Sequence, residues 1–313
     1  MNHRTEGTRV AVIGAGAVGG YFGAMLARAG VPTVLIGRAA FVDAVRRAGL
    51  RIDSYQFQET VHPEVSTELT AARDAELVLF CVKTTDTAVA SKELANVLKP
   101  DAIVVSMQNG VNNVEEIRAA SGIEALAAVV YVAASVPAPG MVKHLGRGDL
   151  VIGPRNKKTE RVAEIFADAQ VPCVISGNME GELWKKLVWN SALNAISALG
   201  RVTYGEIAAS EDAKKVVEAV VYETLAVARA KGVEIPGLED PASAIAGSFK
   251  IAEQMRGMRS STAQDLARDK YTEIDSLNGF VARLGAKLRV ITPVNHALYT
   301  LVKLYETGFV EKR

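Results

Sequence analysis

Near its start the chain reads Val10-Ala11-Val12-Ile13-Gly14-Ala15-Gly16-Ala17-Val18-Gly19. The first four residues form a continuous apolar run typical of a buried strand, and the residues from 17 to 29 have the pattern of a helix. A G-x-G-x-x-G turn between a strand and a helix is the arrangement that binds the pyrophosphate of a dinucleotide. The sequence therefore predicts such a site, and the alternative is a glycine-rich turn that binds no ligand.

Further apolar runs alternate with helical patterns through the first half of the chain. The runs cover residues 33–36, 77–82 and 102–107, and the helical patterns cover 41–47, 85–98 and 114–120. This alternation predicts a parallel sheet with helices on both faces, which is a Rossmann-type doubly wound α/β domain. We expect antiparallel edge strands between about residues 49 and 67, and a further strand over 141–153.

From about residue 180 onward the patterns are helical. They cover residues 180–199, 212–231, 262–286 and 293–306, with Gly and Pro residues between them. The sequence thus predicts two domains, an α/β domain over residues 1–176 and an all-α domain over residues 177–313.

Composition narrows the class of protein. Of 313 residues, 49% are hydrophobic and 23% are charged, as in an ordinary globular protein, and the formal net charge is +1. That balance predicts no nucleic-acid partner, and no apolar stretch reaches the roughly 18 residues of a membrane helix. With a polar beginning and no apolar leader, the chain is expected to be cytoplasmic. The two cysteines, Cys81 and Cys173, and four scattered histidines predict neither a disulfide framework nor a metal site.

The choice of dinucleotide depends on the end of the second apolar run, where Gly37 and Arg38 follow. A protein that prefers NAD usually has Asp or Glu there to bind the ribose 2′-hydroxyl, but no carboxylate occurs between Ile36 and Asp43. A guanidinium suits the 2′-phosphate of NADP(H), which is the predicted cofactor. The alternative is that Arg38 is an ordinary solvated residue at the start of a helix.

Two more side chains come directly after strands. Lys83 follows the run over 77–82, and Asn109 follows the run over 102–107. In an open parallel sheet these positions face the ligand crevice, so both are candidates for contact with cofactor or substrate. The alternatives are a solvated lysine and a common Asn-Gly turn.

In the second half, residues 182–194 carry the clearest polar pattern. On a helix Lys186, Asn190 and Asn194 lie four residues apart and form one polar stripe. A lysine and two asparagines among Trp and Leu residues require partners, because burying unpaired polar groups is costly. We therefore expect the stripe to face the interior or the edge of a cleft, and the alternative is a solvent-facing stripe on a surface helix.

Two further stretches complete the candidate site. On the expected helix Glu273 shares a face with Leu277 and Phe280, so its carboxylate calls for a partner, and Lys186 is a candidate. The alternative is a first-turn carboxylate that the helix dipole favours. Residues 260–265 look like a helix N-cap with Gln264 near the third helical position, and their hydroxyls are also suited to a substrate carboxylate.

Together these motifs resemble the ketopantoate reductase (2-dehydropantoate 2-reductase) family, from Val10 to the end of the chain. The resemblance is carried by the glycine loop, Arg38, residues 81–83, 108–110 and 182–187, Asn190, Asn194, residues 272–275, and Asn278-Gly279. It implies NADPH-dependent reduction of 2-dehydropantoate to (R)-pantoate, a step toward pantothenate and coenzyme A.

The resemblance also implies roles for individual residues. Lys186 is the expected proton donor, and Glu273 is the second catalytic residue, at the junction of cofactor and substrate. The expected cofactor-binding residues are Gly14, Ala15, Gly16, Ala17, Val18, Gly19, Arg38, Lys83, Asn109 and Glu273. Lys186, Asn190, Asn194 and Ser261 are the expected substrate-binding residues. A lysine is protonated at neutral pH, since its ordinary pKa is about 10.4, so it is suited to stabilise an alkoxide and donate a proton.

Two departures from the family pattern leave the substrate open. Asp86 stands where a glutamine is common, and Tyr204 stands where a polar amide is expected. The alternatives are a reductase of another branched or aromatic 2-oxo acid, or a non-catalytic sensor that binds NADPH. Exposed apolar stripes in the helical domain predict a homodimer, and no nucleic-acid or membrane partner is expected.

Overall fold

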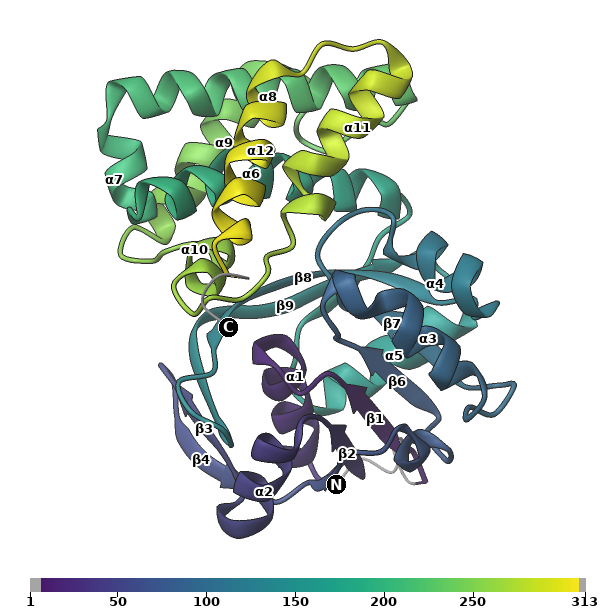
Figure 1. The fold of residues 1–313 in the computed structure, drawn as a ribbon. Coiled ribbons are helices and arrows are strands. Elements are labelled where there is room, and N and C mark those ends of the chain that lie inside the picture. The colour runs from purple at the N-terminus through teal and green to yellow at the C-terminus, as the bar shows by residue number, and fades with distance from the viewer. Residues whose placement is uncertain (1–6, 310–313) are drawn as a thin grey trace. The chain divides into compact units, whose positions relative to one another are not determined.

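The computed structural model describes residues 7–309, which fall into two compact units that divide between Met179 and Glu180. The first unit alternates strands and helices, whereas the second is built of helices (Figure 1). Between residues 7 and 309 no helix is long and apolar enough to cross a membrane.

The first unit is organised around one ten-stranded sheet. Its strands are β1 (Val10–Ile13), β2 (Thr33–Ile36), β3 (Leu50–Ser54), β4 (Gln58–Val61), β5 (Glu64–Ser66), β6 (Leu77–Phe80), β7 (Ile103–Ser106), β8 (Leu126–Ser135), β9 (Met141–Gly153) and β10 (Cys173–Ile175). They follow the order β4-β3-β9-β8-β7-β6-β1-β2-β5, and β10 pairs with β9. Strands β8, β7, β6, β1, β2 and β5 are parallel, while the β3–β4 and β8–β9 pairs are antiparallel.

Helices cover both faces of this sheet. They are α1 (Ala17–Arg28), α2 (Ala39–Ala48), α3 (Thr87–Ala95), α4 (Asn113–Ser121) and α5 (Lys157–Asp168), with short 3₁₀ turns η2 (Leu69–Ala72) and η3 (Thr84–Asp86). Successive residues of β1 belong to different cores, because side chains alternate between the faces of a strand. Val12 lies in the core that contains Phe22 and Phe166, whereas Ile13 lies in the core that contains Leu94 and Ile117. The predicted doubly wound fold is confirmed.

The second unit is helical throughout its described part. Its elements are α6 (Met179–Gly200), α7 (Tyr204–Ala209), α8 (Glu211–Lys231), α9 (Pro241–Gln254), α10 (Ser261–Leu266), the 3₁₀ turn η4 (Ile274–Ser276), α11 (Asn278–Leu288) and α12 (Pro293–Thr307). Local sequence explains several boundaries. Ser210 caps α8 by accepting a hydrogen bond from the N–H of Ala213, and Gly232 ends that helix in the left-handed conformation.

The predicted continuous helix over residues 262–286 is wrong. The chain leaves α10 at Leu266, turns at Asp269 with φ of +49°, and returns to helix only in η4 and α11. A short polar side chain tolerates the left-handed region at Asp269, where a helix is interrupted. Glu273 consequently lies outside any α-helix, immediately before η4, and not on a helical face with Leu277.

Candidate active site

The glycine loop has the geometry that its spacing predicts. Gly14 has φ of +91°, and a Cβ there would lie 2.7 Å from the carbonyl oxygen of Cys81, so no other residue fits. A Cβ on Gly19 would collide with the carbonyl oxygen of Gly14 and lie 2.9 Å from a methyl carbon of Val12. These two glycines let helix α1 start directly against the sheet.

Gly16 is different, because a Cβ there would meet nothing within 4 Å. It caps α1 without a side chain, and the first turn of that helix contains no acidic residue. Steric demand inside the protein therefore does not explain this glycine, and the open space beside its backbone would let a ligand approach closely. The positive end of the α1 dipole and its N–H groups suit an anionic ligand, so the loop fits a pyrophosphate.

Arg38 lies at the same edge of the sheet as the glycine loop. The carbonyl oxygen of Ile36, at the end of β2, accepts hydrogen bonds from the N–H groups of Gly14 (3.0 Å) and Ala15 (3.2 Å). Arg38 follows two residues later as the exposed N-cap residue of α2. Within residues 7–309 no carboxylate forms an ion pair with it, so its guanidinium is available to a ligand.

The buried amide of Gln108 connects the ends of β6 and β7, a role that the sequence did not reveal. Its Nε2 donates to the carbonyl oxygen of Val82 (3.1 Å) and to Oγ1 of Thr87 (2.8 Å). This bridge fixes the two strand ends that carry the predicted residues Lys83 and Asn109, both half-buried. A glutamine directly after a buried strand was the available signal. Asp86, one of the departures, is exposed at the N-cap of α3.

In the second unit the predicted polar stripe lies on α6. Lys186 and Asn190 are half-buried, whereas Asn194 is only 3% exposed. All three lie within one 22-residue helix, so the four-residue spacing places them on one face. The structure thus brings these three candidates together.

Asn194 is held from both its side chain and its backbone. The buried hydroxyl of Tyr204, from α7, donates to Oδ1 of Asn194 (2.9 Å). Oγ of Ser260 donates to the carbonyl oxygen of Asn194 (2.9 Å) and accepts from the N–H of Ala263 (3.0 Å). Burial raises the pKa of Tyr204, so its hydroxyl remains a donor. The sequence pattern singles out Tyr204 but does not show its partner.

The cap of α10 differs by one residue from the expected arrangement. Ser260 is the N-cap residue, so the third helical position is Ala263 and not Gln264. Ser261 is the first residue of the helix and is exposed. Because Ser260 bonds to Asn194, the substrate candidates Asn194 and Ser261 lie near each other in the second unit.

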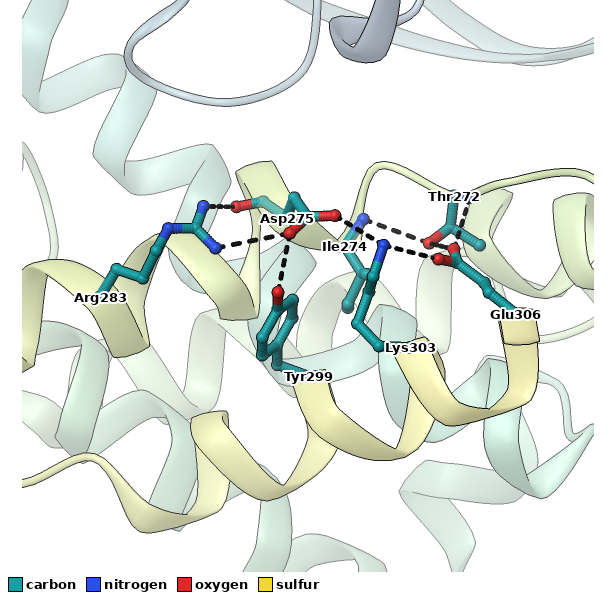
Figure 2. A network of polar contacts seen from close by, with 7 residues as sticks. All are labelled: Thr272, Ile274, Asp275, Arg283, Tyr299, Lys303 and Glu306. Carbon is teal, nitrogen blue, oxygen red and sulfur yellow. Dashed lines mark hydrogen bonds and ion pairs between the residues drawn. The ribbon is translucent and has the colours of Figure 1, made fainter.

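Glu273 is half-buried and lies in a segment whose ends are bonded to helix α12. Thr272, one residue before it, bonds to Glu306, and Asp275, two residues after it, bonds to Tyr299 and Lys303 (Figure 2). The sequence did not indicate these anchors. Nowhere in the described part of the chain do three or more His, Cys, Asp or Glu side chains gather to hold a metal ion. The ammonium, amide, hydroxyl and carboxylate groups of the candidate residues are suited to anion binding and to acid–base chemistry.

Comparison with known proteins places these residues in a family. The model of "Ketopantoate reductase PanE/ApbA" matches residues 10–157, and the model of its C-terminal part matches residues 178–306. The 2-dehydropantoate 2-reductase of Archaeoglobus fulgidus is 33% identical over 310 residues, which cover 96% of this chain and 98% of that protein. The enzyme of the same name from Pyrococcus abyssi is 31% identical over 301 residues, which cover 94% of this chain and 97% of that protein.

Solved structures agree with this placement. The crystal structure of a PanE/ApbA family ketopantoate reductase from Ralstonia eutropha JMP134 is 46% identical, with a TM-score of 0.90 and coverage of 96% of this chain and 99% of that one. A D-mandelate dehydrogenase solved with NADH and anilino(oxo)acetate shares the fold, with 24% identity, a TM-score of 0.88 and coverage of 96% and 99%. The chain belongs to the ketopantoate reductase PanE/ApbA family and is an oxidoreductase.

Proposed function

We propose that this protein reduces 2-dehydropantoate to (R)-pantoate with NADPH, a step toward pantothenate and coenzyme A. The observation that carries the proposal is the match of both parts of the ketopantoate reductase family to consecutive parts of one chain. Relatives named 2-dehydropantoate 2-reductase, at 31% and 33% identity over nearly their whole length, support the same substrate. Because the chain is an oxidoreductase, the alternative of a non-catalytic sensor is set aside.

The cofactor is a nicotinamide dinucleotide, and we assign NADP(H) within that class. The open backbone at Gly16 supports pyrophosphate binding along residues 14–19. The exposed guanidinium of Arg38, which no described carboxylate neutralises, supports binding of a 2′-phosphate. Lys83 and Asn109 are assigned to the nicotinamide half. Residues 1–176 then form the cofactor-binding domain, and residues 177–313 form the domain for substrate binding and dimerisation.

The proposed chemistry assigns a role to each candidate residue of the second unit. When bound, the reduced nicotinamide supplies the hydride. The ammonium of Lys186 stabilises the developing charge on the carbonyl oxygen and donates the proton that completes the hydroxyl group. Glu273 orients that ammonium, and Asn190, Asn194 and Ser261 bind the carboxylate and hydroxyl groups of the substrate.

A second candidate substrate class is another branched or aromatic 2-oxo acid. The observation that favours it is the bond from Tyr204 to Asn194, because this bond occupies an amide oxygen that would otherwise accept from a substrate hydroxyl. With Oδ1 of Asn194 occupied, the substrate site has one hydrogen-bond acceptor fewer, which favours an acid that carries fewer hydroxyl groups.

The test is oxidation of NADPH, followed by its absorbance, with 2-dehydropantoate beside a panel of branched and aromatic 2-oxo acids. The proposal expects the highest kcat/KM with 2-dehydropantoate. Higher kcat/KM with an apolar acid supports the second candidate, and no oxidation with any acid of the panel contradicts both.

We also propose that the protein acts in the cytoplasm as a homodimer. Leu301 and Leu304 are exposed by 51% and 60% on α12 and offer an apolar surface to a second copy. Light scattering should give twice the mass of the chain, and the mass of a single chain would contradict the dimer.

A further inference from the structure

One face of helix α12 holds the segment that contains Glu273. Tyr299, Lys303 and Glu306 are spaced by four and three residues, so they lie on the same side of the helix. Figure 2 shows all three side chains reaching toward the segment from Thr272 to Asp275. That segment has no α-helical hydrogen bonds of its own, since it lies between α10 and α11.

The first anchor is the carboxylate of Glu306, which is only 2% exposed. Its Oε1 accepts hydrogen bonds of 2.7 Å from both the N–H and the hydroxyl of Thr272. Oγ1 of Thr272 in turn accepts from the N–H of Ile274 (3.2 Å). The backbone is therefore fixed on both sides of Glu273.

The second anchor is Asp275. Its Oδ1 accepts from the hydroxyl of Tyr299 (2.9 Å), and its carbonyl oxygen accepts from Arg283 (2.6 Å). Nζ of Lys303 lies 3.0 Å from Oδ2 of Asp275 and 2.9 Å from Oε2 of Glu306. Lys303 thus joins the two anchors.

The position and the charge of Glu306 are both unfavourable for the stability of the folded protein. It lies in the last turn of α12, where the helix dipole disfavours a negative charge, and it is withdrawn from water. The ion pair with Lys303 and the two bonds from Thr272 offset this cost. A group that is costly to bury and bonds to the residue next to Glu273 is suited to fix that residue.

We propose that Glu306 is a positioning residue for Glu273. It holds the backbone of residues 272–274 so that the carboxylate of Glu273 keeps one orientation toward Lys186. This inference rests on the proposed function, because the catalytic role of Glu273 belongs to that proposal.

The test is a double-mutant cycle on kcat at saturating NADPH. Glu306→Ala should lower kcat by about ten-fold with little change in KM, since small misplacements of catalytic groups are costly. In a Glu273→Gln background the same change should alter kcat by less than about two-fold, because coupled residues are not additive. Glu306→Gln keeps an acceptor for Thr272 and should recover most of the loss.

Glu223→Ala is the matched control. Glu223 is a carboxylate that accepts from the N–H groups of Val294 and Asn295, both at 2.8 Å, at the other end of α12. Its removal perturbs the same helix and should leave kcat within about two-fold of the wild type. The proposal would be overturned if Glu306→Ala lowered kcat by the same factor in the wild-type and Glu273→Gln backgrounds. It would also be overturned if Glu223→Ala lowered kcat as much as Glu306→Ala.

Hydrogen exchange gives a readout that does not depend on turnover. A peptide covering residues 272–277 should exchange faster in Glu306→Ala than in Glu223→Ala, while the rest of the second unit, apart from the start of α12 where Glu223 accepts from Val294 and Asn295, stays alike. Unchanged exchange in that peptide overturns the proposal, whatever substrate the enzyme takes. If Glu306→Ala does not fold, Thr272→Val, which removes the hydroxyl that donates to Glu306, replaces it in both measurements. Failure of wild-type turnover across the 2-oxo acid panel would instead contradict the proposed function.

Discussion

The hydroxyl of Tyr204 donates a 2.9 Å hydrogen bond to Oδ1 of Asn194, and both side chains are buried. This bond settles which way the amide of Asn194 faces, because its oxygen is turned toward Tyr204. No described residue accepts from its Nδ2, which leaves the NH₂ group as the donor for a ligand. In the proposed reaction Asn194 therefore binds an acceptor group of the substrate, such as its carboxylate.

Tyr204→Phe should raise KM for the 2-oxo acid several-fold and leave NADPH binding unchanged. It also leaves a buried amide oxygen without its donor, which should lower the free energy of unfolding by about 1–3 kcal/mol. Steady-state kinetics and urea unfolding measure the two effects. Tyr222→Phe is the control, since Tyr222 is 54% exposed on α8. Unchanged KM in Tyr204→Phe would show that the orientation of Asn194 does not matter for binding.

Arg38→Asp should weaken NADPH much more than NADH, because only NADPH carries the 2′-phosphate that the guanidinium is proposed to bind. Fluorescence titration with both cofactors gives the ratio of dissociation constants. Arg47→Asp, an exposed change of equal charge in the last turn of α2, should leave that ratio unaltered. The same loss for both cofactors in Arg38→Asp would mean that Arg38 does not distinguish them.

Gly16→Ala should mainly weaken NADPH binding, whereas Gly19→Ala should mainly lower the stability of the fold. Gly16→Ala has room inside the protein, so it should cost at most about 1 kcal/mol of stability as a poorer helix cap, yet it should weaken NADPH binding strongly. Gly19→Ala forces a Cβ against Val12 and the Gly14 carbonyl, and should cost about 1–3 kcal/mol of unfolding free energy. Thermal unfolding and NADPH titration test both variants. Intact NADPH binding in Gly16→Ala would show that this loop does not bind the pyrophosphate.

Stability at low pH should depend on Asp275. Burial favours its neutral form, but the bonds from Lys303 and Tyr299 outweigh burial, so the pKa of Asp275 lies below its ordinary 3.8. A carboxyl group whose pKa falls on folding contributes stability above its unfolded pKa and loses it as pH drops through the folded value. Asp275→Asn should therefore lower stability at neutral pH and reduce the further loss on acidification. Urea midpoints measured from neutral pH to below 3.8 check this, and parallel curves for variant and wild type would contradict it.

Local patterns predicted the central strands and helices of the first unit, but not α5, β10 or the parallel pairing of β5 with β2, where an antiparallel edge strand was expected. The glycine spacing predicted the turn from β1 into α1, and the role of Gly19 follows from contacts with Val12 and Gly14 in the same turn, whereas Gly14 also packs against the carbonyl group of Cys81, beyond β6. The stripe on α6 was equally visible, because residues four apart share a face of any helix.

The surroundings of Glu273 in the second unit, and those of Lys83 and Asn109 in the first, depend on contacts that no local pattern encodes. Thr272 and Glu306 are 34 residues apart, and Gln108 reaches Val82 across 26 residues. The helical periodicity over 262–286 also continued through Asp269, where one left-handed residue interrupts the helix. Long-range bonds and single backbone conformations of this kind decide where the proposed catalytic side chain of Glu273 lies, and the sequence does not display them.

The most direct test of the account is the kcat of Lys186→Ala with 2-dehydropantoate at saturating NADPH. The neighbouring half-buried lysine provides the control, as Lys185→Ala. With Lys186 as the proton donor, Lys186→Ala should lose most of the reductase activity, on the order of 10²–10⁴-fold, while its dissociation constant for NADPH stays within a few-fold of the wild type. Near-normal turnover at saturation together with lost NADPH binding would contradict the assignment of Lys186, and with it the proposed chemistry.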